Sequence, residues 1–179
     1  NGTFDFKKKV FQNIIYQCNH LRKNIKYEKN PAKRIQVLSA LILSGIVFKE
    51  YRSNYEVGIK ELEKFVKHYF DSDGFPLTRN PNDLILFTQY LILCHENISE
   101  AQEFVPEFLG EIIKKNLLCI KLFKTPDDKL PLFNGSSENS INHLEKYLEK
   151  FKLSKKDKKN TIGGIFFAKS KNQILYFDV

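Results

Sequence analysis

Residues 37–48 read VLSALILSGIVF, a stretch that is apolar on every side if it forms a helix. A helix without a polar face is buried all round in a globular protein. The pair Asn30-Pro31 precedes it, and Asn at the N-cap with Pro at the first helical position is a helix-start signal. The sequence therefore predicts a buried helix that begins at Pro31.

Helices of two kinds alternate around this stretch. Amphipathic stripes run through residues 4–27 and 54–70, and a second Asn-Pro pair, Asn80-Pro81, opens a mostly apolar helix that continues through Cys94. This alternation predicts a mainly α protein, a two-layer array of helical hairpins with the apolar helices inside.

Two more helices are expected before residue 153. Ser99 and Gln102 have the spacing of a capping box, which predicts a helix start at Ser99. Pro106 should divide the amphipathic segment that follows or lie in its first turn. A last, short helix is expected over about 138–152.

After residue 160 the pattern changes from helix to strand. Runs rich in β-branched and aromatic residues, at 161–168 and 174–179, flank a turn at 170–172 and predict a β-hairpin. We therefore predict three parts: a helical domain over 1–153, a Lys-rich linker over 154–160, and the start of a β domain over 161–179.

Length and composition limit the class of protein. The 179 residues are 42% apolar and 28% charged, as in a globular domain. No apolar run reaches the roughly 18 residues of a membrane span. The cysteines, Cys18, Cys94 and Cys119, lie in apolar helical patterns and are predicted to be buried free thiols. The chain has no Met and ends within an apolar run, so we expect it to be an internal fragment of a longer protein.

The basic charge suggests a polyanionic partner. The formal net charge is +8, which would suit nucleic acid, an acidic polysaccharide or a membrane surface. Most of the basic residues are Lys, which favours a solvated surface over a binding footprint. A basic helical module that binds nucleic acid stays open as an alternative, although the sequence has no recognition helix with a basic face.

Common catalytic motifs are absent from the sequence. It has no Gly-rich phosphate loop, no paired-cysteine metal site and no nucleophile elbow, and its four histidines are scattered. The sequence therefore predicts no cofactor and no metal.

The segment DGFPLTRNP, residues 73–81, is the first candidate site. It holds Arg79, one of few arginines in a Lys-rich chain, and a guanidinium pairs bidentately with a carboxylate or sulfate. Arg79 is the candidate catalytic and substrate-binding residue, and Asn80 is a second substrate-binding candidate. The alternative is that Asn80 only caps the helix and Arg79 pairs with a nearby acid.

The segment LPLFNGS, residues 130–136, is the second candidate. Asn134 is the substrate-binding candidate there. The alternative is a simple turn, because Asn-Gly is turn chemistry.

These segments, in this order, resemble the heparinase II/III-like family of polysaccharide lyases. That family has an incomplete α/α toroid followed by an antiparallel β-sandwich. The matching stretches are the apolar helix at 39–45, the turn from Asp73 to Pro81 and the loop at 132–135. The hairpin at 162–179 looks like the entry to the sandwich, so the resemblance implies the later toroid and the first sandwich strands.

The resemblance implies β-elimination on a uronate-containing acidic polysaccharide. Removal of the C5 proton of a uronate requires neutralisation of its carboxylate, and the family is expected to use Asn, His or Arg for this, with Tyr or His as base and acid. Arg79 falls on the family's Arg, and Asn134 falls on the Asn of its Phe-Asn loop. Family analogy also suggests a periplasmic or exported protein.

The sequence departs from the family pattern at two places. Thr78 stands where lyases often carry Glu, and Ala32-Lys33 align with an Asn-His pair that helps to neutralise the carboxylate. The sandwich Tyr and His would lie beyond Val179. The fragment alone is therefore expected to be inactive, and the alternative is a non-catalytic carbohydrate-binding or envelope-associated scaffold of the same fold.

Overall fold

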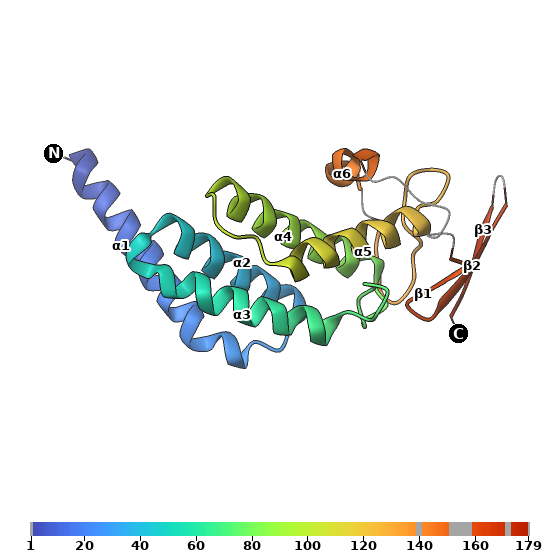
Figure 1. Ribbon diagram of the computed structural model, residues 1–179, viewed down its shortest axis with the longest axis horizontal. Helices are drawn as coiled ribbons and strands as arrows, with labels where there is room; N and C mark the ends of the chain where they lie inside the picture. Colours follow the sequence, from blue (N-terminus) through green and yellow to red (C-terminus); the bar gives the residue numbers. More distant parts are fainter. Residues whose placement is uncertain (1, 139–140, 151–158, 171–172, 179) are drawn as a thin grey trace. The chain divides into compact units, whose positions relative to one another are not determined.

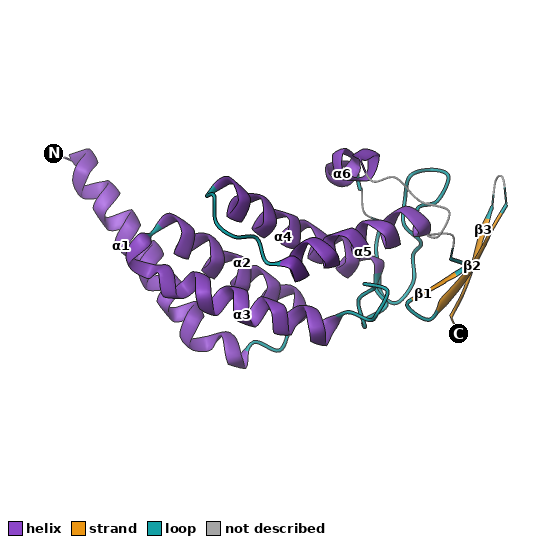
Figure 2. Cartoon of the chain, viewed as in Figure 1, coloured by secondary structure: helices purple, strands orange, loops and turns teal. Residues whose placement is uncertain are grey.

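The computed structural model describes residues 2–138, 141–150, 159–170 and 173–178, and its secondary structure is drawn in Figure 2. The chain folds as two compact units. The first unit comprises Asn1–Phe65 and Leu93–Phe104, and the second comprises Val66–Ile92 and Val105–Val179. The fold is mainly α with a small antiparallel sheet in the second unit, as the sequence predicts.

The first unit is mainly helical, and the helices up to α3 (Arg52–Tyr69), whose last residues belong to the second unit, lie close to the predicted ranges (Figure 1). The Asn30 side chain accepts a hydrogen bond from the Lys33 backbone N–H at 3.1 Å, so Asn30 caps the helix that starts at Pro31. The elements are α1 (Gly2–Asn24), η1 (Ile25–Tyr27), α2 (Pro31–Val47), η2 (Lys49–Tyr51) and α3 (Arg52–Tyr69).

Helix α2 is the buried helix that its sequence predicts. None of its residues from Val37 to Ile46 is exposed. Two glycines let α3 approach it closely: a Cβ on Gly45 would lie 2.7 Å from the Tyr55 Cβ, and one on Gly58 would lie 2.7 Å from Ile42. Small residues at these two positions therefore set the distance between the helices.

The predicted helix start at Ser99 is wrong. Ser99 lies in the last turn of α4 (Pro81–Glu100), and the next helix, α5 (Glu107–Phe123), begins directly after Pro106. Gln102 has φ +57°, and the Glu103 N–H bonds back to the Ile98 carbonyl at 3.1 Å. This is a Schellman C-cap with Gln in the left-handed position that Gly usually takes, so the segment ends a helix instead of starting one.

The second unit joins helices to the sheet. The predicted helix over 138–152 is two short pieces, while residues 139–140 and 151–152 lie outside the described residues. The elements after α5 are η3 (Asn142–Leu144), α6 (Glu145–Lys150), β1 (Thr161–Ile162), β2 (Ile165–Lys169) and β3 (Ile174–Asp178).

The sheet has the order β1-β2-β3 with antiparallel neighbours. The run 161–168, predicted as one strand, is itself a tight hairpin because Gly163 and Gly164 have φ of +60° and +71°. Two residues with positive φ between antiparallel strands form a tight turn whose twist matches the right-handed twist of the strands. The predicted turn at 170–172 falls partly on residues 171–172, which lie outside the described residues.

An aromatic cluster centred on Phe123 ties the sheet to the helices. Its ring lies 5.0 Å from Phe75, 5.4 Å from Phe167 and 5.7 Å from Tyr176, between ring centroids. Ile162 and Ile165 are buried in the same core as the α4 and α5 side chains. The strands are thus held by helical residues within this unit.

The predicted Lys-rich linker falls largely on residues 154–158, which lie outside the described residues. Lys159 pairs with Asp73 at 2.5 Å, and this carboxylate raises the pKa of the Lys159 ammonium through their hydrogen bond. The division of the chain at 153–161 into a helical and a β domain stays a prediction.

The cysteines lie in the interior of the protein. Cys18, Cys94 and Cys119 are all free and buried, as predicted.

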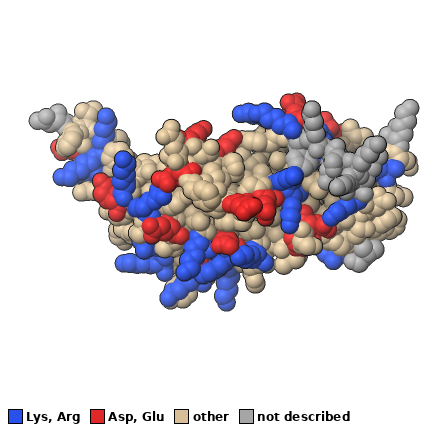
Figure 3. Space-filling model, in the orientation of Figure 1, with Lys and Arg blue, Asp and Glu red and all other residues tan. Residues whose placement is uncertain are grey.

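Acidic side chains stand among the basic ones in Figure 3, and ion pairs such as Arg34–Glu61 and Lys124–Asp128 join the two kinds. None of the described helices combines the length and apolar character that a membrane span requires.

Candidate functional site

The segment that carries Arg79 is a loop in the second unit, ordered by hydrogen bonds. The Asp71 carboxylate accepts backbone N–H groups of Asp73 at 2.9 Å and Phe75 at 2.8 Å, so it organises the turn. Gly74 has φ +85°, and a Cβ there would lie 2.5 Å from the Lys115 Cβ. Phe75 is completely buried and anchors the loop to the core.

Arg79 lies at the end of this loop in a left-handed conformation, with φ +53°. Its backbone N–H donates to the Pro76 carbonyl at 2.8 Å, which closes a turn. Its guanidinium forms an ion pair with the Asp178 carboxylate at the end of β3. The nearby acid that the alternative interpretation required is therefore present.

Asn80 caps α4. Its side-chain oxygen accepts the Asn82 backbone N–H at 2.8 Å, and its carbonyl accepts the Asp83 N–H at 3.1 Å. Pro81 occupies the first helical position. The Asn80 side chain thus has a structural task, and its assignment to a binding site stays a prediction.

Asn134 and Gly135 form the corner of the second loop. Their φ values are +52° and +80°, and the Ser136 N–H donates to the Phe133 carbonyl at 3.1 Å, the pattern of a type I′ turn. The Asn134 side-chain amide donates to the Arg79 carbonyl at 3.1 Å. The two loops that the sequence singled out are therefore in direct contact.

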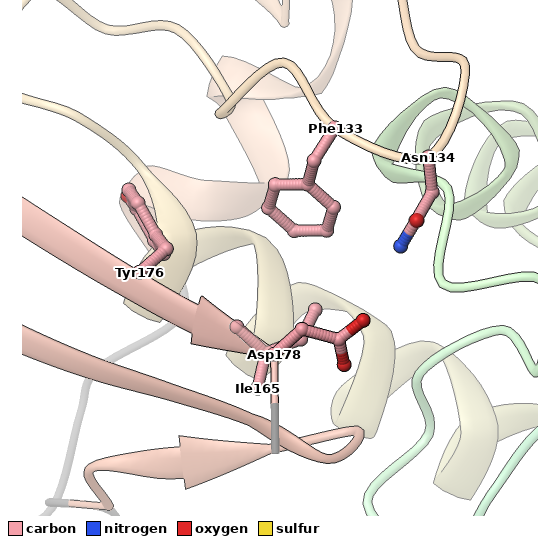
Figure 4. A pocket seen from close by; sticks show the side chains of 5 residues that line it. All are labelled: Phe133, Asn134, Ile165, Tyr176 and Asp178. Atoms are coloured by element: carbon pink, nitrogen blue, oxygen red, sulfur yellow. The ribbon is translucent and has the colours of Figure 1, made fainter.

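A pocket of about 290 Å³ opens beside this contact. Figure 4 shows Phe133 and Asn134 pointing into it from the loop, opposite Ile165 and Asp178 from the sheet, with Tyr176 at its side. Arg79 is not among its lining residues, but Asn134 and Asp178 both line the pocket and both contact Arg79. Arg79 therefore lies next to the pocket, in contact with two of the residues that line it.

The pocket combines an aromatic wall with two polar groups. Phe133 and Tyr176 lie 6.2 Å apart between ring centroids, while Asn134 offers an amide and Asp178 a carboxylate. Apolar walls with a few placed polar groups are typical of small-ligand sites.

Tyr176 is poorly suited to proton transfer. Its hydroxyl donates to the Phe123 carbonyl at 2.7 Å. Burial, reinforced by the charge of Asp127, raises the pKa of Tyr176 to about 12. A general base works best with a pKa near the operating pH, so the described pocket holds no efficient base in Tyr176.

Asp178, Tyr176 and Phe133 were missed as site residues by the sequence analysis. The signal for two of them is the alternation of β3, which puts Ile174, Tyr176 and Asp178 on one side of the strand. No pattern along the chain pairs Asp178 with Arg79, because the two are 99 residues apart.

The described pocket has a single carboxylate, Asp178, among its lining residues. None of its five lining residues is a histidine. In the part of the chain that the structure describes, no group of three or more His, Cys, Asp or Glu side chains could hold a metal ion.

The fold and the pocket define a mainly α protein with a terminal antiparallel hairpin and a small polar-aromatic site. Residues 3–160 match the family model described as Heparinase II/III N-terminus. This chain therefore belongs to the heparinase II/III family, and it is related to polysaccharide lyases. Comparisons with curated proteins and with solved structures give no match.

Proposed function

We propose that this chain belongs to a polysaccharide lyase-like protein that binds a uronate-containing acidic polysaccharide at the pocket beside Arg79. In this proposal Arg79 contacts a carboxylate or sulfate, and Asn134 and Asn80 contribute to the same site. The observation that carries it is the hydrogen bond from Asn134 to the Arg79 carbonyl, which joins the two loops that resemble the family's site.

The chemistry of uronates gives Arg79 a defined task. A negative carboxylate next to C5 opposes formation of a carbanion there, so the carboxylate must be neutralised before the proton can leave. A guanidinium can do this because it is always charged and binds both carboxylate oxygens. The full-length protein would then cleave the polysaccharide by β-elimination and leave an unsaturated uronate at the new end.

A second candidate function is binding without catalysis. Ala32 and Lys33 support it, because they stand at the positions of the family's Asn-His pair. The protein would then be a carbohydrate-binding scaffold that kept the fold of a lyase.

An ultraviolet assay on the full-length protein tests the proposal. Several uronate polysaccharides are offered, and absorbance of the unsaturated product is followed for wild type and Arg79→Ala. Arg52→Ala is the matched control, since Arg52 is also ion-paired and its side chain is 41% exposed against 38% for Arg79. Loss of product with Arg79→Ala alone would support the lyase and the site together.

The other outcomes separate the alternatives. Product formation that survives Arg79→Ala would keep the lyase and discard the site. Binding of a uronate polysaccharide without product would favour the scaffold. Binding of nucleic acid with a steep salt dependence, and of no polysaccharide, would favour the third interpretation, a nucleic-acid-binding module.

A further inference from the structure

The guanidinium that the proposed function assigns to a substrate anion already has an anionic partner. Asp178 forms an ion pair with Arg79 and lines the pocket beside it. We propose that Asp178 is a specificity-determining residue: its carboxylate occupies the place of a substrate anion on Arg79, so that only an anion able to displace it is bound. This inference rests on the proposed function of the same site.

Both partners are held in place by backbone structure. Asp178 is at the end of β3, where it pairs with Ile165 in the antiparallel register. Arg79 is fixed by the turn to Pro76 and by the bond from Asn134 to its carbonyl. The strand and the loop therefore place the backbones of the two residues so that their side chains can pair.

The ion pair is open to exchange. The Arg79 side chain is 38% exposed and the Asp178 side chain is 61% exposed. Ion pairs at such exposed sites contribute little, because water screens the charges. A ligand carboxylate or sulfate can therefore reach the guanidinium from solvent, but it must displace Asp178 and tolerate its negative charge nearby.

The consequence is selection by charge density. A single weak anion gains about as much binding free energy from Arg79 as the Asp178 carboxylate does. Such an anion therefore has no advantage when it displaces Asp178. A polymer with several anionic groups brings further contacts and a high local concentration of replacement anions, which favours exchange. Asp178 would thus exclude isolated carboxylates while admitting a polyanionic chain.

Anion binding by charge-matched variants tests this role. The probes are inorganic sulfate and a short oligouronate, titrated calorimetrically against wild type, Asp178→Asn, Asp128→Asn and Arg79→Ala/Asp178→Asn. Asp128→Asn is the matched control: it removes the same charge, its side chain is 63% exposed, and its partner is Lys124. Asp178→Asn should bind sulfate about three- to fivefold more tightly than wild type, and the oligouronate should gain by a smaller factor.

Each result decides the question. The gain should be absent from Asp128→Asn and should vanish in the double variant, because it depends on the guanidinium. Equal affinity of Asp178→Asn and wild type, or no sulfate binding by Asp178→Asn, would overturn the inference. If Asp178→Asn binds sulfate more tightly through Arg79 but no variant binds uronate, the role of Asp178 stands and the proposed function fails. If uronate binding depends on Arg79 but Asp178→Asn gains no affinity, the proposed function stands and the role of Asp178 fails.

Discussion

Asn134 donates its side-chain amide to the carbonyl of Arg79, 55 residues away, and both residues have left-handed backbones. Left-handed conformations are unfavourable for residues other than Gly, although Asn tolerates them best. The bond links two turns that would each be costly alone. It places candidate residues from two separate segments against each other.

Two substitutions of Asn134 distinguish the contribution of its side-chain hydrogen bond to stability from the cost of its positive φ. Asn134→Gly keeps the left-handed turn and loses the bond, so the free energy of unfolding should fall by about 1 kcal/mol. Asn134→Ala also carries the strain of a positive φ and should cost roughly 1 kcal/mol more. Urea unfolding measures both variants. Equal stability of the two variants would contradict the claim that the turn needs a residue tolerant of positive φ.

Phe123 should be the most sensitive aromatic residue of the second unit. It is 1% exposed and contacts aromatic rings from the loop, β2 and β3. Phe123→Ala leaves a cavity and should lower the free energy of unfolding by about 3–5 kcal/mol. Phe104→Ala is the control, since Phe104 is 83% exposed and should change stability by less than about 0.5 kcal/mol. Comparable losses in the two variants would refute the central role of Phe123.

Two glycines should respond to Ala in opposite directions. A Cβ on Gly163 would lie 2.9 Å from Phe75, on a backbone with φ +60°, so Gly163→Ala should destabilise the protein by about 1–3 kcal/mol. Gly110 in α5 has nothing within 4 Å of an added Cβ, so Gly110→Ala should stabilise it by about 0.5–1 kcal/mol. Thermal unfolding of both variants checks the signs, and a stabilising Gly163→Ala would contradict the turn geometry.

Tyr176 should make stability depend on alkaline pH. Its pKa is raised from 10.0 to about 12, so the folded protein keeps a proton that the unfolded chain loses. The stabilisation is complete below pH 10 and is lost as the pH rises towards 12. Urea unfolding of wild type and Tyr176→Phe across this pH range measures the difference between their free energies of unfolding. The titration of other groups is common to both proteins and cancels in this difference. A constant difference between the two proteins would exclude the shift.

Much of the fold could be predicted because it depends on local signals. The starts of α2 and α4 follow from Asn-Pro pairs, and the strands after residue 160 follow from composition. The predicted start at Ser99 failed for a local reason as well. A Ser and a Gln three residues apart fit either end of a helix, and the left-handed Gln102 belongs to a C-cap.

The sequence by itself determined the helical class, the hairpin, the family resemblance and the two loops that carry Arg79 and Asn134, because side-chain periodicity and turn chemistry act over a few residues. Only the tertiary structure decided what these loops contact. The strand that brings Asp178 to Arg79 is positioned by the burial of Ile165 and Phe167 against helical side chains, a long-range packing effect that no spacing along the chain records. The pocket and its carboxylate therefore come from packing in three dimensions, whereas Arg79 and Asn134 could be singled out from the local chemistry of their own segments.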